Sequence, residues 1–497
     1  MKAKFLLCAV SLSLSVSLGA QEVASLRSPA TPTGGYAELF GGYESGGFHS
    51  GYDAASLWKV GAKAEGTHRG RHVTWNGRFG FEHFSGENML TSMFIHPGYY
   101  PIDVLEFTPG NKTRQTYSFG GSMLAGLGER WLLGGKMSYE AINYAKRKDI
   151  RHTTYGMDFS IEPTVGVKLS DGKAILSMSY IFRKTAETID AEQVGTATDE
   201  SYYAFLDKGM RYGAYQVWDG DGIHLDEAGV GLLPVKEYSH GFSIVILSRP
   251  VSNHAELLFK QGIVGEKGYT WFRFPGYAIR DRLSGSHNAP AFTGSWELEY
   301  RLDSDRLEES VLDKVTDGGV TTPVVYAFNG VSDRAHHQMK GTYGMHFRSG
   351  AVRLLQAEVS YAKWLEASYL FYPYRDALDI NFGLAGIKAG FEAWRFLIDA
   401  DVWAGWGGKT EKGLGEVLGD APVQPYRLQG DWDRKMEYLT ATRCGVSMGL
   451  TYRFQSVRGL RITADGSWQH GFNLTVLPGS ERFTAGLRLG YEFSQKQ

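Results

Sequence analysis

Hydrophobic and polar residues alternate one by one over long stretches of this chain. In the run MDFSIEPTVGVKL at 157–169, apolar side chains occupy the odd positions, and polar residues or glycine occupy the even ones. A period of two places these two sets on opposite faces of a β-strand. The run is longer than a typical strand of five or six residues, and it fits the ~9–11 residues of a tilted strand that crosses a bilayer.

The same alternation predicts about 18 strands along the chain, with 16 as the alternative count. The expected strands begin near residues 35, 55, 72, 115, 131, 155, 174, 239, 253, 291, 306, 338, 352, 377, 392, 438, 459 and 482. Two of them have an alternative interpretation. The glycine-rich segment 36–43 could lie inside a barrel, and the segment 306–316, which has acidic residues on both faces, could be a helix.

The expected connections alternate between short and long. Short turns are predicted near 67–70, 128–130, 170–173, 250–252, 303–305, 349–351 and 454–458, and long segments near 85–114, 185–237, 266–290, 317–336 and 405–437. Aromatic residues such as Trp58, Trp394 and Phe493 gather at the strand ends. Outer-membrane barrels have tight periplasmic turns, long surface loops and aromatic girdles. The predicted fold is therefore all-β, a single antiparallel transmembrane β-barrel over residues 21–497.

The first twenty residues have a different character. Lys2 and Lys4 precede a mostly apolar stretch that ends in Leu18-Gly19-Ala20. This is the pattern of a secretory signal peptide, so residues 1–20 are expected to be removed. A buried N-terminal helix is the alternative, but the segment has no acidic residue and no helix cap.

Composition narrows the remaining possibilities. Without the two lysines of the signal peptide, 50 of the 52 Lys and Arg residues remain against 54 Asp and Glu, a formal charge of −4. This mildly acidic balance gives no indication of nucleic acid as a partner. Cys444 is then the only cysteine, so no disulfide within the chain is expected. No later apolar run approaches the ~20 residues of a membrane helix.

The last predicted strand contains the segment AGLRLGYEF, in which a glycine and alternating apolar residues lead to Tyr491 and Phe493. This segment resembles the signal by which outer-membrane proteins engage the barrel-assembly machinery, although Ser494–Gln497 follow the final aromatic residue. The mature chain also resembles a family of uncharacterised outer-membrane barrels of about 500 residues from Bacteroidota-type Gram-negative bacteria. The resemblance implies the fold and an outer-membrane location, in contact with lipid and lipopolysaccharide. It carries over no catalytic or binding residue.

Charged residues of both signs fall on the polar faces of the predicted strands. The candidate lumen-lining residues are Lys59, Lys63, Glu65, Arg78, Glu82, Lys136, Glu140, Asp158, Glu162, Lys168, Arg183, Glu256, Lys260, Glu297, Glu299 and Arg301. A Lys or Arg that faced lipid at mid-depth would cost roughly 2–4 kcal/mol, so these side chains are expected to face the lumen. Two interpretations follow, a solute pathway and an interior closed by ion pairs.

Sites for metals and catalysis have weaker support. Asp219, Asp221, Asp226 and Glu227 form an acidic, glycine-rich cluster that could bind Ca²⁺, but their spacing fails the EF-hand pattern, and a solvated turn explains them as well. We predict no metal site and no cofactor.

The histidines likewise do not indicate a metal-binding or catalytic site. His336 and His337 are adjacent on a strand, so they should point to opposite faces. His83, His240 and His470 are expected at the membrane interface. No G-x-S-x-G nucleophile motif is present, and we predict no catalytic residue.

The leading functional hypothesis is a non-enzymatic diffusion channel or an accessory of a nutrient-uptake system, because about 18 strands can enclose an aqueous lumen. The alternative is a barrel that binds a glycan or a protein, or assists assembly, through long surface loops. An outer-membrane lipid or peptide hydrolase is the third hypothesis. A small solute, a glycan or an uptake-system protein are the candidate partners.

Overall fold

The computed structural model describes residues 33–494, except 149, 170–172, 193–202, 220–221, 224–231, 249, 267–268, 318–319, 371–374 and 415–425. The predicted signal peptide at 1–20 lies outside this range. No helix in the described part of the chain has the length and apolarity needed to cross a membrane.

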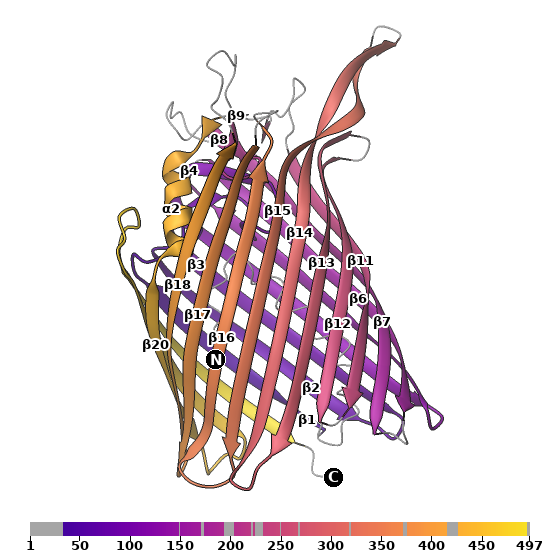
Figure 1. Ribbon diagram of the computed structural model, residues 1–497, viewed down its shortest axis with the longest axis vertical. Helices are drawn as coiled ribbons and strands as arrows, with labels where there is room; N and C mark the ends of the chain where they lie inside the picture. The colour runs from indigo at the N-terminus through magenta and orange to yellow at the C-terminus, as the bar shows by residue number, and fades with distance from the viewer. Residues whose placement is uncertain are drawn as a thin grey trace.

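Eighteen antiparallel strands form a closed barrel (Figure 1). They are β1 (Gly34–Ser45), β2 (Ser56–Arg69), β3 (Val73–Ser92), β4 (Asp103–Leu127), β5 (Trp131–Lys146), β6 (Arg151–Leu169), β7 (Ala174–Glu192), β11 (Leu232–Ser248), β12 (Val251–Glu266), β13 (Tyr269–Asn288), β14 (Phe292–Asp317), β15 (Val320–Phe347), β16 (Val352–Ser368), β17 (Arg375–Ala393), β18 (Phe396–Leu414), β20 (Arg443–Arg453), β21 (Leu460–Gly471) and β22 (Glu481–Ser494). The first and last strands pair from Gly34↔Ser494 to Ser45↔Phe483, which closes the ring.

The predicted count of 18 strands and the barrel class are therefore confirmed, and so is the first strand, but several boundaries were wrong. The predicted connections 85–114, 185–237 and 405–437 include the ends of neighbouring strands, and the largest errors lie between 266 and 336. The segment 266–290, predicted to be a long connection, contains β13. The predicted turn at 303–305 lies inside β14, and the predicted connection 317–336 lies mostly in β15. The missed strand β13 lowered the predicted count by one, and the division of β14 into two strands raised it by one, so the total was still 18. The acidic segment 306–316 is strand and not helix.

The connections at one end of the barrel are short turns, here called the turn end, and the other end is the loop end. The described residues 93–102, 203–219 and 426–442, which belong to three of the predicted long connections, lie together at the loop end. The alternation of length is less strict than expected, because β14 and β15 run for 26 and 28 residues and project beyond the other strands (Figure 1). Their surplus length replaces a long loop.

Five further elements lie at the loop end. The hairpin of β8 (Tyr203–Asp207) and β9 (Tyr212–Asp219) pairs with the start of β4, from Asp103↔Asp207 to Glu106↔Ala204. The two-residue strands β10 (Gly222–Ile223) and β19 (Tyr426–Arg427) pair with β9. The helix α2 (Gln429–Thr440) precedes β20 and buries Trp432 and Met436.

The outer surface of the barrel is apolar. Its exposed large side chains include Trp58, Phe79, Phe119, Val165, Phe242, Val359, Ile387, Val402 and Leu487. A water-exposed surface of this kind is rare in soluble proteins, whereas a transmembrane barrel needs an apolar band around its outside. Most charged residues of the strands take the opposite orientation and point inward.

Candidate functional site

The segment 93–102, here called the crossing loop, leaves the wall between β3 and β4 and runs through the interior of the barrel. Its sequence MFIHPGYYPI contains two prolines, which cannot donate to a strand ladder, and Gly98 at φ 77°, a left-handed conformation that suits glycine. The loop therefore cannot continue the β3–β4 hairpin. Its side chains instead reach strands far away in the sequence.

Two glutamates of the wall bind the crossing loop at its middle. Glu187 of β7 accepts a hydrogen bond from the backbone N–H of Ile95 at 2.7 Å and lies 3.0 Å from His96 Nδ1. Glu237 of β11 accepts one from the hydroxyl of Tyr99 at 2.7 Å. Both carboxylates are buried, so each bond satisfies a group that would otherwise be costly to bury.

Arg334 of β15 binds the backbone of the crossing loop at residues 98–100. Its guanidinium donates hydrogen bonds to the carbonyl oxygens of Gly98 at 2.8 Å and Tyr100 at 2.9 Å, and also to that of Tyr99. Asp305 of β14 pairs with the same guanidinium at 2.5 and 2.8 Å and fixes its orientation. Since β3 is the third and β15 the twelfth of the eighteen barrel strands, they stand on opposite walls. The crossing loop spans the full width of the lumen.

An apolar core fills the space around the crossing loop. Met93, Phe94, Tyr100 and Ile102 of the loop belong to one buried cluster with side chains of six wall strands, namely Ile189, Ala191, Leu233, Val235, Val264, Trp271, Phe272, Phe274, Leu307 and Val331. Tyr100 and Phe274 contact edge to face, with their ring centroids 5.6 Å apart. Full burial of a large apolar side chain contributes roughly 1.5–3 kcal/mol, so this core holds the loop firmly against the wall.

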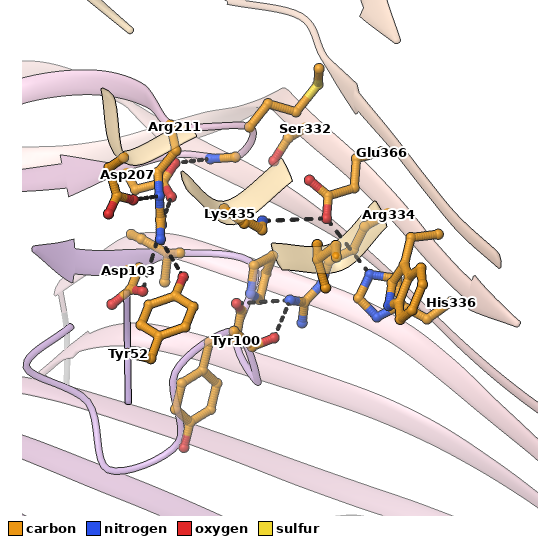
Figure 2. A pocket seen from close by; sticks show the side chains of 18 of the residues that line it. Tyr52, Tyr100, Asp103, Asp207, Arg211, Ser332, Arg334, His336, Glu366 and Lys435 are labelled. Carbon is orange, nitrogen blue, oxygen red and sulfur yellow. Dashed lines mark hydrogen bonds and ion pairs between the residues drawn. The ribbon is translucent and has the colours of Figure 1, made fainter. Parts of the chain in front are cut away.

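The β8–β9 hairpin covers the crossing loop and is held by a charged cluster at its turn. Arg211 lies in this turn at φ 62°, after Gly209 at φ 111° and Met210 at φ 54°. Its guanidinium pairs with Asp207 at 2.5 Å and Asp431 of α2 at 2.5 Å, and it donates to the hydroxyl of Tyr52 (Figure 2). Arg211 thus joins the hairpin, the helix and the segment 46–55.

Asp103 completes this cluster from the start of β4. Its Oδ1 accepts hydrogen bonds from Ser92 Oγ at 2.6 Å and from the backbone N–H of Val104 at 2.8 Å, while Oδ2 lies 3.8 Å from Arg211. This end of β4 pairs with the hairpin, well before the outward apolar residues that begin at Tyr117. Burial raises the pKa of Asp103 to about 7, against the opposing effect of Arg211.

The helix α2 closes the remaining side of the loop end. Trp432 and Met436 pack on the inward residues Leu378 and Ile380 of β17. Glu437 accepts hydrogen bonds from the backbone N–H groups of the segment 475–477. Burial would raise the pKa of this carboxyl, but those hydrogen bonds outweigh burial and lower the pKa.

Between these segments and the wall lies a cavity of about 120 Å³. Its lining includes Tyr52, Tyr100, Asp103 and Arg211 on one side, and Arg334, His336, Glu366 and Lys435 on the other (Figure 2). Trp364 also lines the cavity and contacts the ring of His336. Glu366 Oε1 lies 3.8 Å from His336 Nε2 and 3.7 Å from Lys435 Nζ. The cavity is therefore a small interior space with charged groups at both sides and aromatic rings between them.

The sixteen charged residues singled out from the sequence share one orientation, opposite to that of the exposed apolar side chains of their strands. Their contacts are Lys59–Glu44 at 3.3 Å, Lys63–Glu38 at 2.9 Å, Glu65–Asn76 at 3.0 Å, Glu82–Arg114 at 3.2 Å, Glu162–Arg183 at 3.9 Å, Arg183–Glu256 at 3.1 Å, Lys260–Asp303 at 2.6 Å, Glu299–Arg301 at 2.6 Å, Lys168 to the carbonyl of Glu129 at 3.1 Å, and Glu297 with Arg282. Arg78, Lys136, Glu140 and Asp158 have the same orientation. Of the sixteen, none lines the cavity.

The other candidates from the sequence lie elsewhere. Asp219 ends β9, and Asp221, Asp226 and Glu227 lie outside the described residues, so a calcium site there stays a prediction. Within the described ranges, no group of three or more His, Cys, Asp or Glu side chains has the arrangement of a metal site.

The two adjacent histidines diverge, as predicted. His336 lines the cavity, whereas His337 faces outward and contacts the hydroxyl of Tyr300 at 3.1 Å. His83, His240 and His470 each lie against an outward aromatic ring, with centroid distances of 5.1 Å to Trp58, 5.1 Å to Phe182 and 4.6 Å to Phe472. Only His336 of these five belongs to the site.

The site itself was missed from the sequence. The crossing loop, Arg211 and α2 lie in segments that were assigned to long connections. One signal was available for the helix, because Leu428, Trp432 and Met436 recur every four residues, a helical spacing. Nothing in the sequence indicated that 93–102 would turn inward.

Several solved structures resemble this barrel. The FrpB iron transporter from Neisseria meningitidis has 8% sequence identity and a TM-score of 0.42, covering 95% of this chain and 83% of its own. The RagAB peptide importer has 8% sequence identity and a TM-score of 0.41, covering 93% of this chain and 75% of its own. The siderophore receptor PirA from Acinetobacter baumannii has 8% identity and a TM-score of 0.39, covering 94% of this chain and 81% of its own. These likenesses concern the fold alone.

No curated protein matches the sequence. A family model matches residues 24–493, which is nearly the whole chain. The chain therefore belongs to the family described as "Family of unknown function (DUF6850)".

Proposed function

We propose that this protein is a non-enzymatic uptake channel of the outer membrane of a Gram-negative bacterium, of the Bacteroidota type by its sequence resemblance, and that its own loops close its mouth. The apolar outer surface supports the location, because every backbone group of a closed barrel is paired between strands and only the outward side chains meet lipid. Lipid and lipopolysaccharide are then its surroundings, and β22 is the strand that engages the barrel-assembly machinery.

The location predicts opposite effects for two adjacent residues of β16. Val359 is 61% exposed on the outer face, whereas Ser360 points inward. Val359→Arg should cost about 2–4 kcal/mol at mid-depth and reduce the amount of folded barrel in membranes, since it places a charge against lipid. Ser360→Arg is the matched control and should assemble normally. Folded protein is measured by its heat-dependent mobility in gels. Equal losses from both variants would contradict a lipid-facing Val359.

Sidedness follows from the connections, because long loops are tolerated at the cell surface. Tyr326, 66% exposed on the projecting β14–β15 hairpin, should then lie outside the cell, and Arg458 in the turn 454–459 should face the periplasm. In a Cys444→Ser background, a membrane-impermeant thiol reagent should label Tyr326→Cys on intact cells and Arg458→Cys only after lysis. The reverse pattern would invert the orientation.

One observation carries the functional proposal: the crossing loop spans the lumen and is bound to the far wall by Arg334. A barrel of 18 strands is wide enough for an aqueous channel, so a bound loop across it acts as a gate. The sixteen inward charged residues, eight cationic and eight acidic, are proposed to line the path beyond the gate. Their balance predicts weak discrimination between cations and anions.

Swelling of proteoliposomes tests this proposal with the intact protein. In isosmotic solutions, a pentose should pass slowly but faster than through protein-free liposomes, while a long oligosaccharide should not pass. Passage of neither solute, before or after removal of the crossing loop, would show that the barrel conducts nothing. A binding protein that acts through its surface loops would then replace the channel.

A further inference from the structure

The cavity at the loop end carries more acid than base. Five carboxylates line it, those of Asp103, Asp207, Asp333, Glu366 and Asp431, against three cationic side chains. The formal charge of the lining is therefore −2 with His336 neutral. The surplus is concentrated on one side, where Asp103 and Asp207 (Figure 2) and also Asp431 surround the single guanidinium of Arg211.

Arg211 does not satisfy all three carboxylates equally. It contacts Asp207 and Asp431 at 2.5 Å each, whereas Asp103 Oδ2 lies at 3.8 Å, beyond hydrogen-bond distance. The Asp103 side chain is only 6% exposed, and Oδ2 has no hydrogen-bond partner within the described residues. A buried carboxylate oxygen without a partner is costly, so this atom is a ready acceptor for a donor that enters the cavity.

The rest of the lining suits an organic group attached to such a donor. Tyr52, Tyr100, Trp364 and Tyr438 present aromatic surface to the cavity, and the buried hydroxyl of Tyr100 also lacks a hydrogen-bond partner among the described residues. Aromatic faces attract cations as well as apolar groups. The volume of about 120 Å³ is below the ~300–1,000 Å³ of sites for drug-sized ligands, so the ligand is small.

We propose that this cavity binds the ammonium group of a small organic amine, with Asp103 Oδ2 as the hydrogen-bond acceptor and the aromatic rings around the organic part. The inference rests on the proposed uptake function and names the class of solute that the loop end selects. Free amines and amino acids share this ammonium chemistry. Binding of the ammonium group supplies the positive charge that the carboxylate cluster lacks.

The site should be pH-dependent. Since burial raises the pKa of Asp103 to about 7, its carboxyl is largely protonated in the empty cavity at pH 6 and largely ionised at pH 8. The groups that face it are Arg211, which favours the ionised form, Ser92, which donates to Oδ1, and Asp207, which disfavours ionisation. An ammonium ion prefers the carboxylate, so its affinity should rise over this interval.

Calorimetric titration of the full-length protein in detergent tests the proposal with matched probes. Benzylamine should bind, and the neutral benzyl alcohol and the anionic benzoate should bind at least roughly tenfold more weakly, because charge-assisted hydrogen bonds are the stronger ones. Asp103→Asn should weaken benzylamine binding by roughly tenfold to a hundredfold and remove its pH dependence. Asp399→Asn, which alters an inward carboxylate paired with Arg353 and away from the cavity, is the control and should bind as wild type.

Phenylglycine, which carries a carboxylate beside its amine, distinguishes a site for amino acids from a site for simple amines. Binding as tight as that of benzylamine would support a site for amino acids, and weaker binding would support a site for simple amines. Equal affinity for benzyl alcohol, or an unchanged affinity of a folded Asp103→Asn protein, would overturn the proposal. Binding is measured without a membrane, so a barrel that conducts but ignores amines refutes this inference alone. A barrel that binds amines but never conducts refutes the channel alone.

Discussion

Arg334→Met is expected to open the channel. The substitution removes the hydrogen bonds to three carbonyl groups of the crossing loop and leaves the buried carboxylate of Asp305 without the guanidinium. Loss of one partner of a buried pair costs about 3–5 kcal/mol, much of it borne by the closed state that buries these groups. At 1.4 kcal/mol per factor of ten, the open fraction in planar bilayers should rise roughly a hundredfold or more.

Two further variants make this expectation decisive. Lys340→Met changes a cation of the same strand that pairs with Glu358 and does not touch the crossing loop, and it should leave the closed state unchanged. Replacement of 94–101 by a short glycine–serine linker should give steady conductance whatever Arg334 contributes. If the linker variant opens and Arg334→Met stays closed, the apolar core and not the arginine holds the gate.

The barrel class was predictable from the sequence because a membrane strand needs only a period of two, and that signal survives over many strands. The prediction failed where charges interrupted the pattern. Asp303-Ser304-Asp305 was taken for a turn, and β13 was missed because Arg280-Asp281-Arg282 places charges on both of its faces. In the structure, Asp303 pairs with Lys260 at 2.6 Å, and Asp305 orients Arg334.

One of the residues that hid the strands, Asp305, thus orients the arginine that binds the crossing loop. Local rules are expected to fail at functional sites, where side chains serve a distant partner instead of their own element. The contacts of Arg334 with the crossing loop join residues more than 230 positions apart. No local pattern encodes such a contact, so the site required the structure, whereas the inward charged residues followed from alternation alone.

Arg211→Met is expected to release the β8–β9 hairpin and α2, here together called the cover, from the loop end without unfolding the barrel wall. Three carboxylates, the turn of the β8–β9 hairpin, the start of α2 and the hydroxyl of Tyr52 converge on this one buried guanidinium. Its removal leaves the buried Asp207 and the partly buried Asp431 without this counter-charge, and loss of one partner of a buried pair costs about 3–5 kcal/mol. Hydrogen exchange should therefore accelerate by roughly a hundredfold or more in 203–219 and 429–440, while the barrel strands keep their protection.

The pH dependence of that variant identifies the cause. Arg211 lowers the pKa of Asp103 against the larger effect of burial, so this pKa rises further without the guanidinium, and protonation of Asp103 near pH 5 should restore part of the lost protection. Lys409→Met removes an exposed pair with Glu411 at 3.1 Å and serves as the control, since such pairs contribute ~0–1 kcal/mol. Faster exchange throughout the barrel would mean that Arg211 stabilises the whole fold. No change in either segment would assign the attachment of the cover to the packing of Trp432 and Met436 on β17.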